Sequence, residues 1–197
     1  MANVKHFFST LSNPFLKIAG IQALLWGIAG IIISIAMSII APIHYHGLLH
    51  FGPASNNAWW CFAGEHIIIW LIPSILFFVA GKLLSPSHIR GIDVFGTIAF
   101  AQLPFILMNL FFFPESVQKL MNIPTTATPE WIMQQPDMIK GAFITFPSIL
   151  FIVIVLIWMY QAFKVSCNLK GWKLGLSYAV IIIASDIICR QLIKLMY

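Results

Sequence analysis

The chain has 197 residues, of which 60% are hydrophobic and only 9% are charged, and its net charge is +5. Soluble domains carry about 25% charged residues, so this composition excludes an ordinary soluble domain and predicts a protein embedded in a membrane. The basic residues are dispersed along the edges of apolar stretches instead of forming a patch, which argues against nucleic-acid binding. Contact with anionic lipids is sufficient to explain the positive charge.

Residues 1–17 precede the first long apolar stretch and are expected to form a cytoplasmic or interfacial N-terminal segment. Apolar residues recur in it at roughly helical spacing beside Lys5 and Lys17, which fits a short helix at the membrane interface; a frayed terminus is the alternative. The apolar stretch that follows is much longer than the roughly 7–15 apolar residues of a signal peptide. We therefore expect it to be retained as a membrane helix.

Five apolar stretches predict five transmembrane helices. A bilayer core takes roughly 20 apolar residues in helical form, because a helix satisfies its own backbone hydrogen bonds. The predicted spans cover residues 18–41, 66–84, 94–114, 141–163 and 174–196. Glu65 is expected to mark the boundary at which the second span begins. The predicted fold class is therefore an all-α, polytopic membrane bundle that occupies residues 18–197.

The distribution of lysine and arginine predicts a cytoplasmic N-terminus, because short cytoplasmic loops are enriched in these residues. Seven of the eleven lie in the N-terminal segment and in the two connections that five spans place on the same side, namely Lys5, Lys17, Lys82, Arg90, Lys164, Lys170 and Lys173. The loop at residues 42–65 and the connection at residues 115–140 are then outside.

The first outer loop contains the sequence HYHGLLH, in which His44, His46 and His50 precede His66. Closely spaced imidazoles can bind zinc or copper, and His46 and His50 would share a face if this stretch were helical. The sequence has no HExxH or other recognised zinc pattern, nucleophile elbow or phosphate loop. We therefore expect a protein that is not an enzyme and has no cofactor, with a histidine metal site as the alternative.

Three predicted spans contain an internal proline: Pro73, Pro104 and Pro147. Each proline frees the carbonyl four residues earlier and is expected to kink its helix. Ser74 and Ser148 directly follow two of these prolines and are candidates for pairing the freed backbone groups.

The third span begins next to a charged pair. Arg90 and Asp93 are expected at the headgroup level, where an acid at a helix N-terminus meets the positive end of the helix dipole. Small residues follow from Gly96 onward, up to Pro104. We expect this stretch to pack closely against neighbouring helices and to bend at the proline.

Asp186 is the most costly residue to place in the predicted spans, because a carboxylate near the bilayer centre costs about 2.5–3.5 kcal/mol. Arg190 follows one turn later and is its expected partner; a position facing Gln102 or Asn109 would also lower the cost. Asp186 is either part of a structural ion pair or a proton or ligand site. The second possibility, with the prolines and a repeated PSILF sequence, is the basis for a transporter hypothesis.

The connection between the third and fourth spans is the longest polar segment. Thr128 followed by Pro129 predicts the start of a short helix, whose residues Trp131, Ile132 and Met133 can dip into the headgroups. Three cysteines at unrelated spacings predict no disulfide framework.

Asn13 and Pro14 ahead of the first span, the five closely spaced spans and the sequence DVFGTIAFAQLPFIL together resemble the Yip (Ypt-interacting protein) domain family. Asp93 to Thr97 is similar to the Asp-Leu-Tyr-Gly-Pro motif of that family, with threonine in place of proline. The resemblance implies a compact, non-enzymatic, multi-pass protein of a bacterial inner membrane.

The function that the resemblance implies is scaffolding, membrane organisation or recruitment of a partner. The expected partners are membrane lipids and a protein in or at the membrane, with a homo-oligomer as a further candidate. A small secondary transporter or channel-like protein that uses Asp186 is the first alternative. A metal-dependent membrane enzyme that uses the outer histidines is the second.

Overall fold

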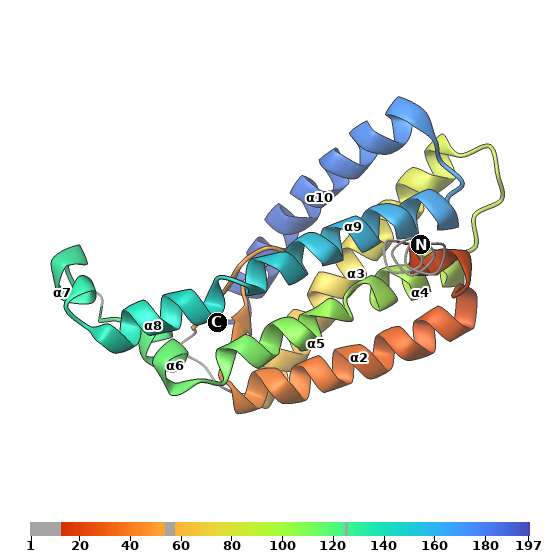
Figure 1. Ribbon diagram of the computed structural model, residues 1–197. Helices are drawn as coiled ribbons and strands as arrows, with labels where there is room; N and C mark the ends of the chain where they lie inside the picture. Colours follow the sequence, from red (N-terminus) through yellow and green to blue (C-terminus); the bar gives the residue numbers. More distant parts are fainter. Residues whose placement is uncertain (1–12, 54–57, 125) are drawn as a thin grey trace, which may run out of the picture.

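The computed structural model describes residues 13–53, 58–124 and 126–197, and it is an all-α bundle with one small hairpin (Figure 1). The helical elements are η1 (Pro14–Leu16), α2 (Gly20–Ile40), α3 (Trp59–Leu84), α4 (Gly91–Ala101), α5 (Pro104–Asn109), η2 (Leu110–Phe112), α6 (Glu115–Met121), α7 (Pro129–Met133), α8 (Pro136–Thr145), α9 (Ser148–Ser166) and α10 (Gly171–Lys194). Strands β1 (His44–Tyr45) and β2 (Phe51–Gly52) pair antiparallel, with Tyr45 opposite Phe51.

Five helical stretches of the described residues are long and apolar enough to cross a membrane, which confirms the predicted polytopic bundle. They are Gly20–Ile40, Trp59–Leu84, Gly91–Phe112, Pro136–Ser166 and Gly171–Lys194. The second helix, α3, begins at Trp59, six residues before Glu65, so the predicted boundary at Glu65 lies within the helix. Most of the predicted interfacial helix at residues 1–17 lies outside the described residues.

Successive spans run in opposite directions, so the connections gather at two ends of the bundle (Figure 1). We call one the hairpin end: it holds the β-hairpin, the first turns of α3, helices α5 to α8 and the last turns of α10. We call the other the opposite end, and it holds the connections at residues 85–90 and 167–170. Helix α10 packs mainly on α3 and diverges from α9 toward the opposite end (Figure 1).

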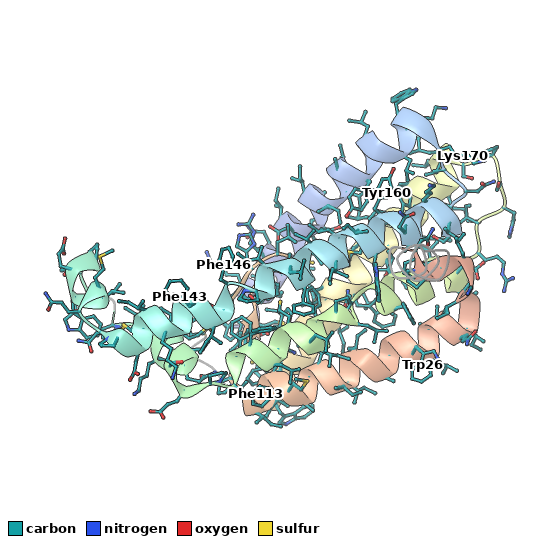
Figure 2. All side chains as sticks on the ribbon, in the orientation of Figure 1. Trp26, Phe113, Phe143, Phe146, Tyr160 and Lys170 are labelled. Atoms are coloured by element: carbon teal, nitrogen blue, oxygen red, sulfur yellow. The ribbon has the colours of Figure 1, made fainter. Side chains whose placement is uncertain are left out.

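The third span is the centre of the bundle. In its most apolar 18-residue window, 67% of the residues are buried, whereas the corresponding share is at most 33% in the other candidate spans. The other helices expose apolar side chains such as Trp26 (Figure 2). Hydrocarbon is an acceptable solvent for these side chains, so this pattern fits a bundle in which α4 and α5 pack against protein and the other spans contact lipid.

Small residues allow α2 and α4 to approach closely. A Cβ added at Gly96 would lie 2.7 Å from the Gly20 carbonyl oxygen and 3.0 Å from the Leu24 nitrogen, and one at Gly27 would lie 2.4 Å from the Ala99 Cβ. These distances leave no room for a methyl group. Gly96 therefore lies at a backbone contact, in agreement with the predicted role of the small residues in this span.

The three internal prolines have different effects. Helix α3 continues through Pro73, while α5 begins at Pro104 and α9 begins just after Pro147. The carbonyl that Pro73 frees belongs to Ile69, and it accepts a hydrogen bond from Gln102 Nε2 at 2.9 Å. The Ser74 hydroxyl instead donates to the Trp70 carbonyl at 2.7 Å. The predicted repair of this backbone by Ser74 was therefore wrong, because a neighbouring helix supplies the donor.

Candidate functional site

A buried carboxylate fastens the β-hairpin to the end of the bundle. Glu65 lies in the second turn of α3 and is fully buried. Its Oε2 accepts a hydrogen bond from the Tyr45 backbone N–H at 2.8 Å, and its Oε1 lies 2.7 Å from His44 Nδ1. The Tyr197 hydroxyl donates to Oε1 as well. A buried carboxylate is costly unless it is paired and hydrogen-bonded. Here the partners come from the hairpin and from Tyr197, three residues after the end of α10.

His44 completes this group. Its ring stacks on Phe62 with centroids 4.1 Å apart, and its Nδ1 lies 2.7 Å from the Tyr197 hydroxyl as well as from Glu65. The Tyr197 hydroxyl uses its own proton on Glu65, so His44 Nδ1 acts as the donor toward these oxygens. His44, Glu65 and Tyr197 thereby join three parts of the chain that are far apart in sequence.

A second set of polar groups forms a directional chain below the hairpin. The Tyr45 hydroxyl donates to Asn109 Oδ1 at 2.6 Å, and Asn109 Nδ2 donates to Ser34 Oγ at 2.9 Å. Ser34 Oγ lies 3.0 Å from His66 Nε2, and His66 Nδ1 lies 2.8 Å from the Phe62 carbonyl oxygen.

The direction of this chain determines the protonation of His66. A carbonyl oxygen can only accept, so His66 Nδ1 carries the proton. Ser34 accepts from Asn109 and uses its own proton to reach Nε2, which therefore acts as an acceptor. His66 is neutral in this arrangement, and every member of the chain is used to connect α2, α3, α5 and the hairpin.

Burial also favours the protonated form of the hydroxyls of Tyr45 and Tyr197, which lie outside the spans. Removal of Tyr45 from water raises the pKa of its hydroxyl well above the usual range, with a further contribution from nearby Glu65. Burial raises the pKa of Tyr197 in the same direction, and its hydrogen bond to Glu65 adds to the effect. Both hydroxyls are therefore protonated at neutral pH and can donate as described.

Asp186 attaches the β-hairpin to the bundle at a second point, through the loop that joins β1 to β2. Its Oδ1 accepts a hydrogen bond from the Leu49 backbone N–H at 3.0 Å and lies 3.2 Å from His50 Nδ1, while its Oδ2 lies 3.1 Å from Arg190 Nε. The expected pairing with Arg190 is present. A Cβ at Gly47 would lie 2.9 Å from Asp186 Oδ1, so the loop backbone approaches the carboxylate closely.

Asp186 does not face Gln102 or Asn109, which were its alternative expected neighbours. Gln102 donates to the Ile69 carbonyl, and Asn109 is part of the chain that connects Tyr45 with Ser34. Asp186 lies near the end of α10 that meets the loop, so its partners come from the hairpin end instead of the middle of the bundle.

The predicted histidine cluster is divided among separate partners. His44 joins Glu65, His50 joins Asp186, His66 joins Ser34, and His46 Nε2 lies 3.0 Å from the Pro53 carbonyl oxygen. Over residues 13–53, 58–124 and 126–197, no group of three or more His, Cys, Asp or Glu side chains is placed to hold a metal ion. The condition under which His46 and His50 would share a helix face is not met, because both lie in the loop that joins β1 to β2.

The remaining predicted residues lie elsewhere. Arg90 Nε is 3.6 Å from Asp93 Oδ2 at the start of α4, where both side chains are partly exposed at the opposite end. Gly96 and Pro104 belong to the packing of α4 and α5 described above. These residues do not join the polar groups of the hairpin end.

Three residues of the site were not predicted, namely Ser34, Tyr45 and Tyr197, and Asn109 was expected only as a possible neighbour of Asp186. Ser34 and Asn109 stand in apolar stretches, and polar residues in a span generally face the interior of the bundle; that signal could have identified them. Comparison of the chain with protein-family models gives no match, and comparisons with curated proteins and with solved structures give no match either.

Proposed function

We propose that the chain is a non-enzymatic membrane protein of the Yip-like type that organises the membrane or recruits a protein partner. Its membrane is proposed to be the bacterial cytoplasmic membrane, with the N-terminus in the cytoplasm, the hairpin end outside and the opposite end inside. The resemblance in layout and in the stretch from Asp93 to Pro104 supports this assignment, as does the position of the basic residues.

One observation carries the proposal. Two carboxylates from different helices each accept a backbone N–H of the same loop, Glu65 from Tyr45 and Asp186 from Leu49. Side chains that would bind a substrate in an enzyme or carry protons in a transporter are here bonded to the protein itself. This arrangement supports a role in holding the outer surface in one shape, which suits a scaffold.

The opposite end is the proposed partner-binding surface. There the Asn168 side chain donates to Ser87 Oγ at 3.0 Å, which joins the two connections at residues 85–90 and 167–170. Arg90 and Lys170 stand exposed beside this contact, so the surface is basic and its loops are tied together. Such a surface fits a partner with acidic groups.

Site-specific photocrosslinking in native membranes tests the proposal. A photoreactive amino acid at exposed His88 is expected to give a discrete protein adduct, while the same amino acid at lipid-facing Ile183 gives none. A variant with Arg90→Glu and Lys170→Glu should lose the His88 adduct and keep its thermal stability. The absence of any adduct at His88 would count against recruitment.

A secondary transporter that uses Asp186 is the second candidate function. The observation in its favour is that Asp186 is largely buried and lies 3.2 Å from His50, a second titratable group. Asp186→Asn would then abolish proton-coupled flux in reconstituted vesicles while the fold remains intact. A variant with unchanged flux would exclude this candidate.

A further inference from the structure

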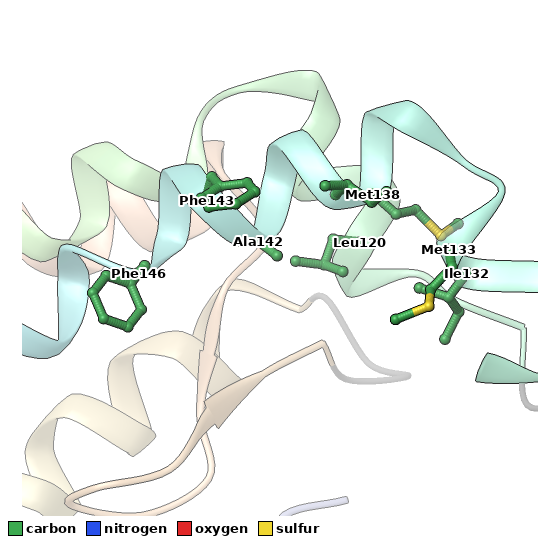
Figure 3. Close-up of a pocket in the computed structure, with 8 residues that line it drawn as sticks. Leu120, Ile132, Met133, Met138, Ala142, Phe143 and Phe146 are labelled. Atoms are coloured by element: carbon green, nitrogen blue, oxygen red, sulfur yellow. The ribbon is translucent and has the colours of Figure 1, made fainter. Parts of the chain in front are cut away.

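An apolar recess lies beyond the bundle at the hairpin end, between α6, α7 and α8 (Figure 3). Leu120 from α6 lies beside Ala142 from α8, and Ile132 and Met133 from α7 lie on the far side (Figure 3). The recess has a volume of about 470 Å³, which lies within the roughly 300–1,000 Å³ range of ligand sites. Its lining side chains are apolar, so it offers shape and dispersion contacts without hydrogen bonds.

The recess opens onto the lipid-facing surface of the fourth span. Phe143 and Phe146, which line the recess, are 77% and 72% exposed. The exposed side chains of Leu150, Val153 and Ile157 continue the same stripe along α9 at intervals of three or four residues, which places them on one face of the helix. No charged residue interrupts this stripe between the recess and the middle of α9.

The length of the fourth span supports this continuity. The helical stretch Pro136–Ser166 has 31 residues, and only 17% of the residues in its most apolar 18-residue window are buried, whereas a bilayer core requires roughly 20 residues. The helical stretch is thus longer than the core by about eleven residues. Its first residues, in α8, supply Met138, Ile139 and Ala142 to a wall of the recess at the hairpin end.

A polar hollow adjoins the recess and shares Met138 with it. Its other lining residues include Asn122, Trp131 and Gln135, together with Lys119 and Asp137, whose Nζ and Oδ2 lie 2.7 Å apart. An amide, an indole and an ion pair can contact the polar part of an amphiphile. The apolar recess and the polar hollow thus stand in the order in which a phospholipid presents its chain and its headgroup.

We propose that this recess binds one membrane phospholipid, with the headgroup in the polar hollow, the first part of one acyl chain in the recess and the rest of the chain along α9. An acyl chain has no hydrogen-bonding groups to leave unsatisfied. An extended protein segment in the same place would bring unpaired backbone N–H and C=O groups against a wall that offers them no partners, which is costly. The occupant that the lining favours is therefore a lipid.

Photolabelling of the purified protein in vesicles tests the proposal. The vesicles consist of phosphatidylethanolamine and phosphatidylglycerol, with a small fraction of phosphatidylethanolamine whose acyl chain carries a diazirine close to the headgroup. Adducts on the peptide that contains residues 132–143 are expected to saturate at one lipid per protein as the probe fraction rises. Contact with bulk lipid alone would give labelling that rises without saturation and is spread over α9 and α10, which would overturn the proposal.

Two variants and one control locate the site. Ala142→Phe fills the recess and should lower the apparent affinity for the lipid probe, read from the saturable labelling, roughly tenfold. Met133→Gln places a polar group in the wall of the recess and should lower this affinity by a smaller factor. The matched control is Ala179→Phe on the exposed face of α10, which should leave the labelling unchanged. Circular dichroism of each variant verifies the fold.

Two further results would contradict the lipid as occupant. If Ala142→Phe converted a dimer to a monomer and left the lipid adducts unchanged, the recess would be an interface between copies of the chain. If it removed a protein adduct and left the lipid adducts unchanged, the occupant would be a protein partner. The saturation measurement on the unmodified chain decides the question even if a variant does not fold.

Discussion

The Glu65 carboxylate accepts a hydrogen bond from the Tyr45 backbone N–H at 2.8 Å, and it thereby joins helix α3 to the β-hairpin. This contact draws the loop into the end of the bundle. The same Tyr45 contributes its hydroxyl to Asn109, so one residue of the hairpin is bonded on both sides. The loop at this end is consequently a part of the core.

Glu65→Gln should destabilise the protein in detergent. The amide cannot accept from the Tyr45 N–H, His44 Nδ1 and the Tyr197 hydroxyl together, and leaving a buried donor unpaired costs about 1–3 kcal/mol. A lower midpoint of thermal unfolding, measured by circular dichroism, is the expected result. Glu115→Gln is the control, because the Glu115 side chain is highly exposed and forms its ion pair with Lys119 at the surface. Equal midpoints for the two variants would contradict a structural role for Glu65.

Asp186→Asn should loosen the loop while the spans remain folded. An asparagine oxygen can still accept from the Leu49 N–H, but the pairing with Arg190 and the charge beside His50 are lost. Hydrogen exchange at residues 46–50 should become faster, with little change in α3 or α9. Asp93→Asn, at the opposite end, should leave exchange in the hairpin unaltered. If the hairpin amides of Asp186→Asn exchanged as slowly as those of the unmodified chain, Asp186 would not hold the hairpin in place.

Gly96→Ala should separate α2 from α4. The new methyl group would meet the Gly20 carbonyl oxygen and the Leu24 nitrogen, and inserting a methyl group into a close-packed contact costs typically about 1–3 kcal/mol. The control is Gly175→Ala, because a Cβ at Gly175 meets nothing within 4 Å and alanine favours a helix over glycine. The midpoint of thermal unfolding should be lower for Gly96→Ala than for the unmodified chain and should not be lower for Gly175→Ala.

The Cys167 thiol should react slowly with alkylating reagents. Burial raises the pKa of this thiol to about 11 from an ordinary value of 9.0, and the thiolate is the reactive form. At pH 8 the thiolate fraction is then about a hundredfold lower than in the unfolded chain, because each pKa unit is a factor of about ten. The rate should rise about tenfold per pH unit up to pH 11.

The labelling rate is measured on a chain that carries Cys61→Ala and Cys189→Ala, so that Cys167 is the only thiol. Denaturant should accelerate the reaction at pH 8. A rate that is already the same as in the denatured chain would show that Cys167 is accessible and that its environment is not the packed contact with Gly81 described by the structure.

The helical fold was predictable because a membrane imposes a length on each apolar stretch, and five such stretches are visible in the sequence. The spans at residues 18–41 and 174–196 correspond closely to α2 and α10. The pair of Asp186 and Arg190 was also predictable, since residues four apart meet on a helix.

The site was less predictable because its contacts are distant in sequence. Glu65 appeared to be a charge at a membrane boundary, and only the folded chain brings Tyr45 and Tyr197 to it. The hairpin has two residues in each strand, which is too short for a periodic pattern. The donor for the Ile69 carbonyl comes from Gln102 on another helix, and local reasoning about Ser74 could not identify it.

Asp186 and Tyr197 lie at the other end of the sequence from the loop that they hold. A ribosome delivers Glu65 and His44 long before it delivers α10. Until that last helix is inserted, the Leu49 N–H and the Glu65 carboxylate lack partners that they have in the finished protein. The loop between α2 and α3 therefore completes its packing only after synthesis of the final helix, and a chain truncated before residue 186 should expose this loop to quality-control proteases.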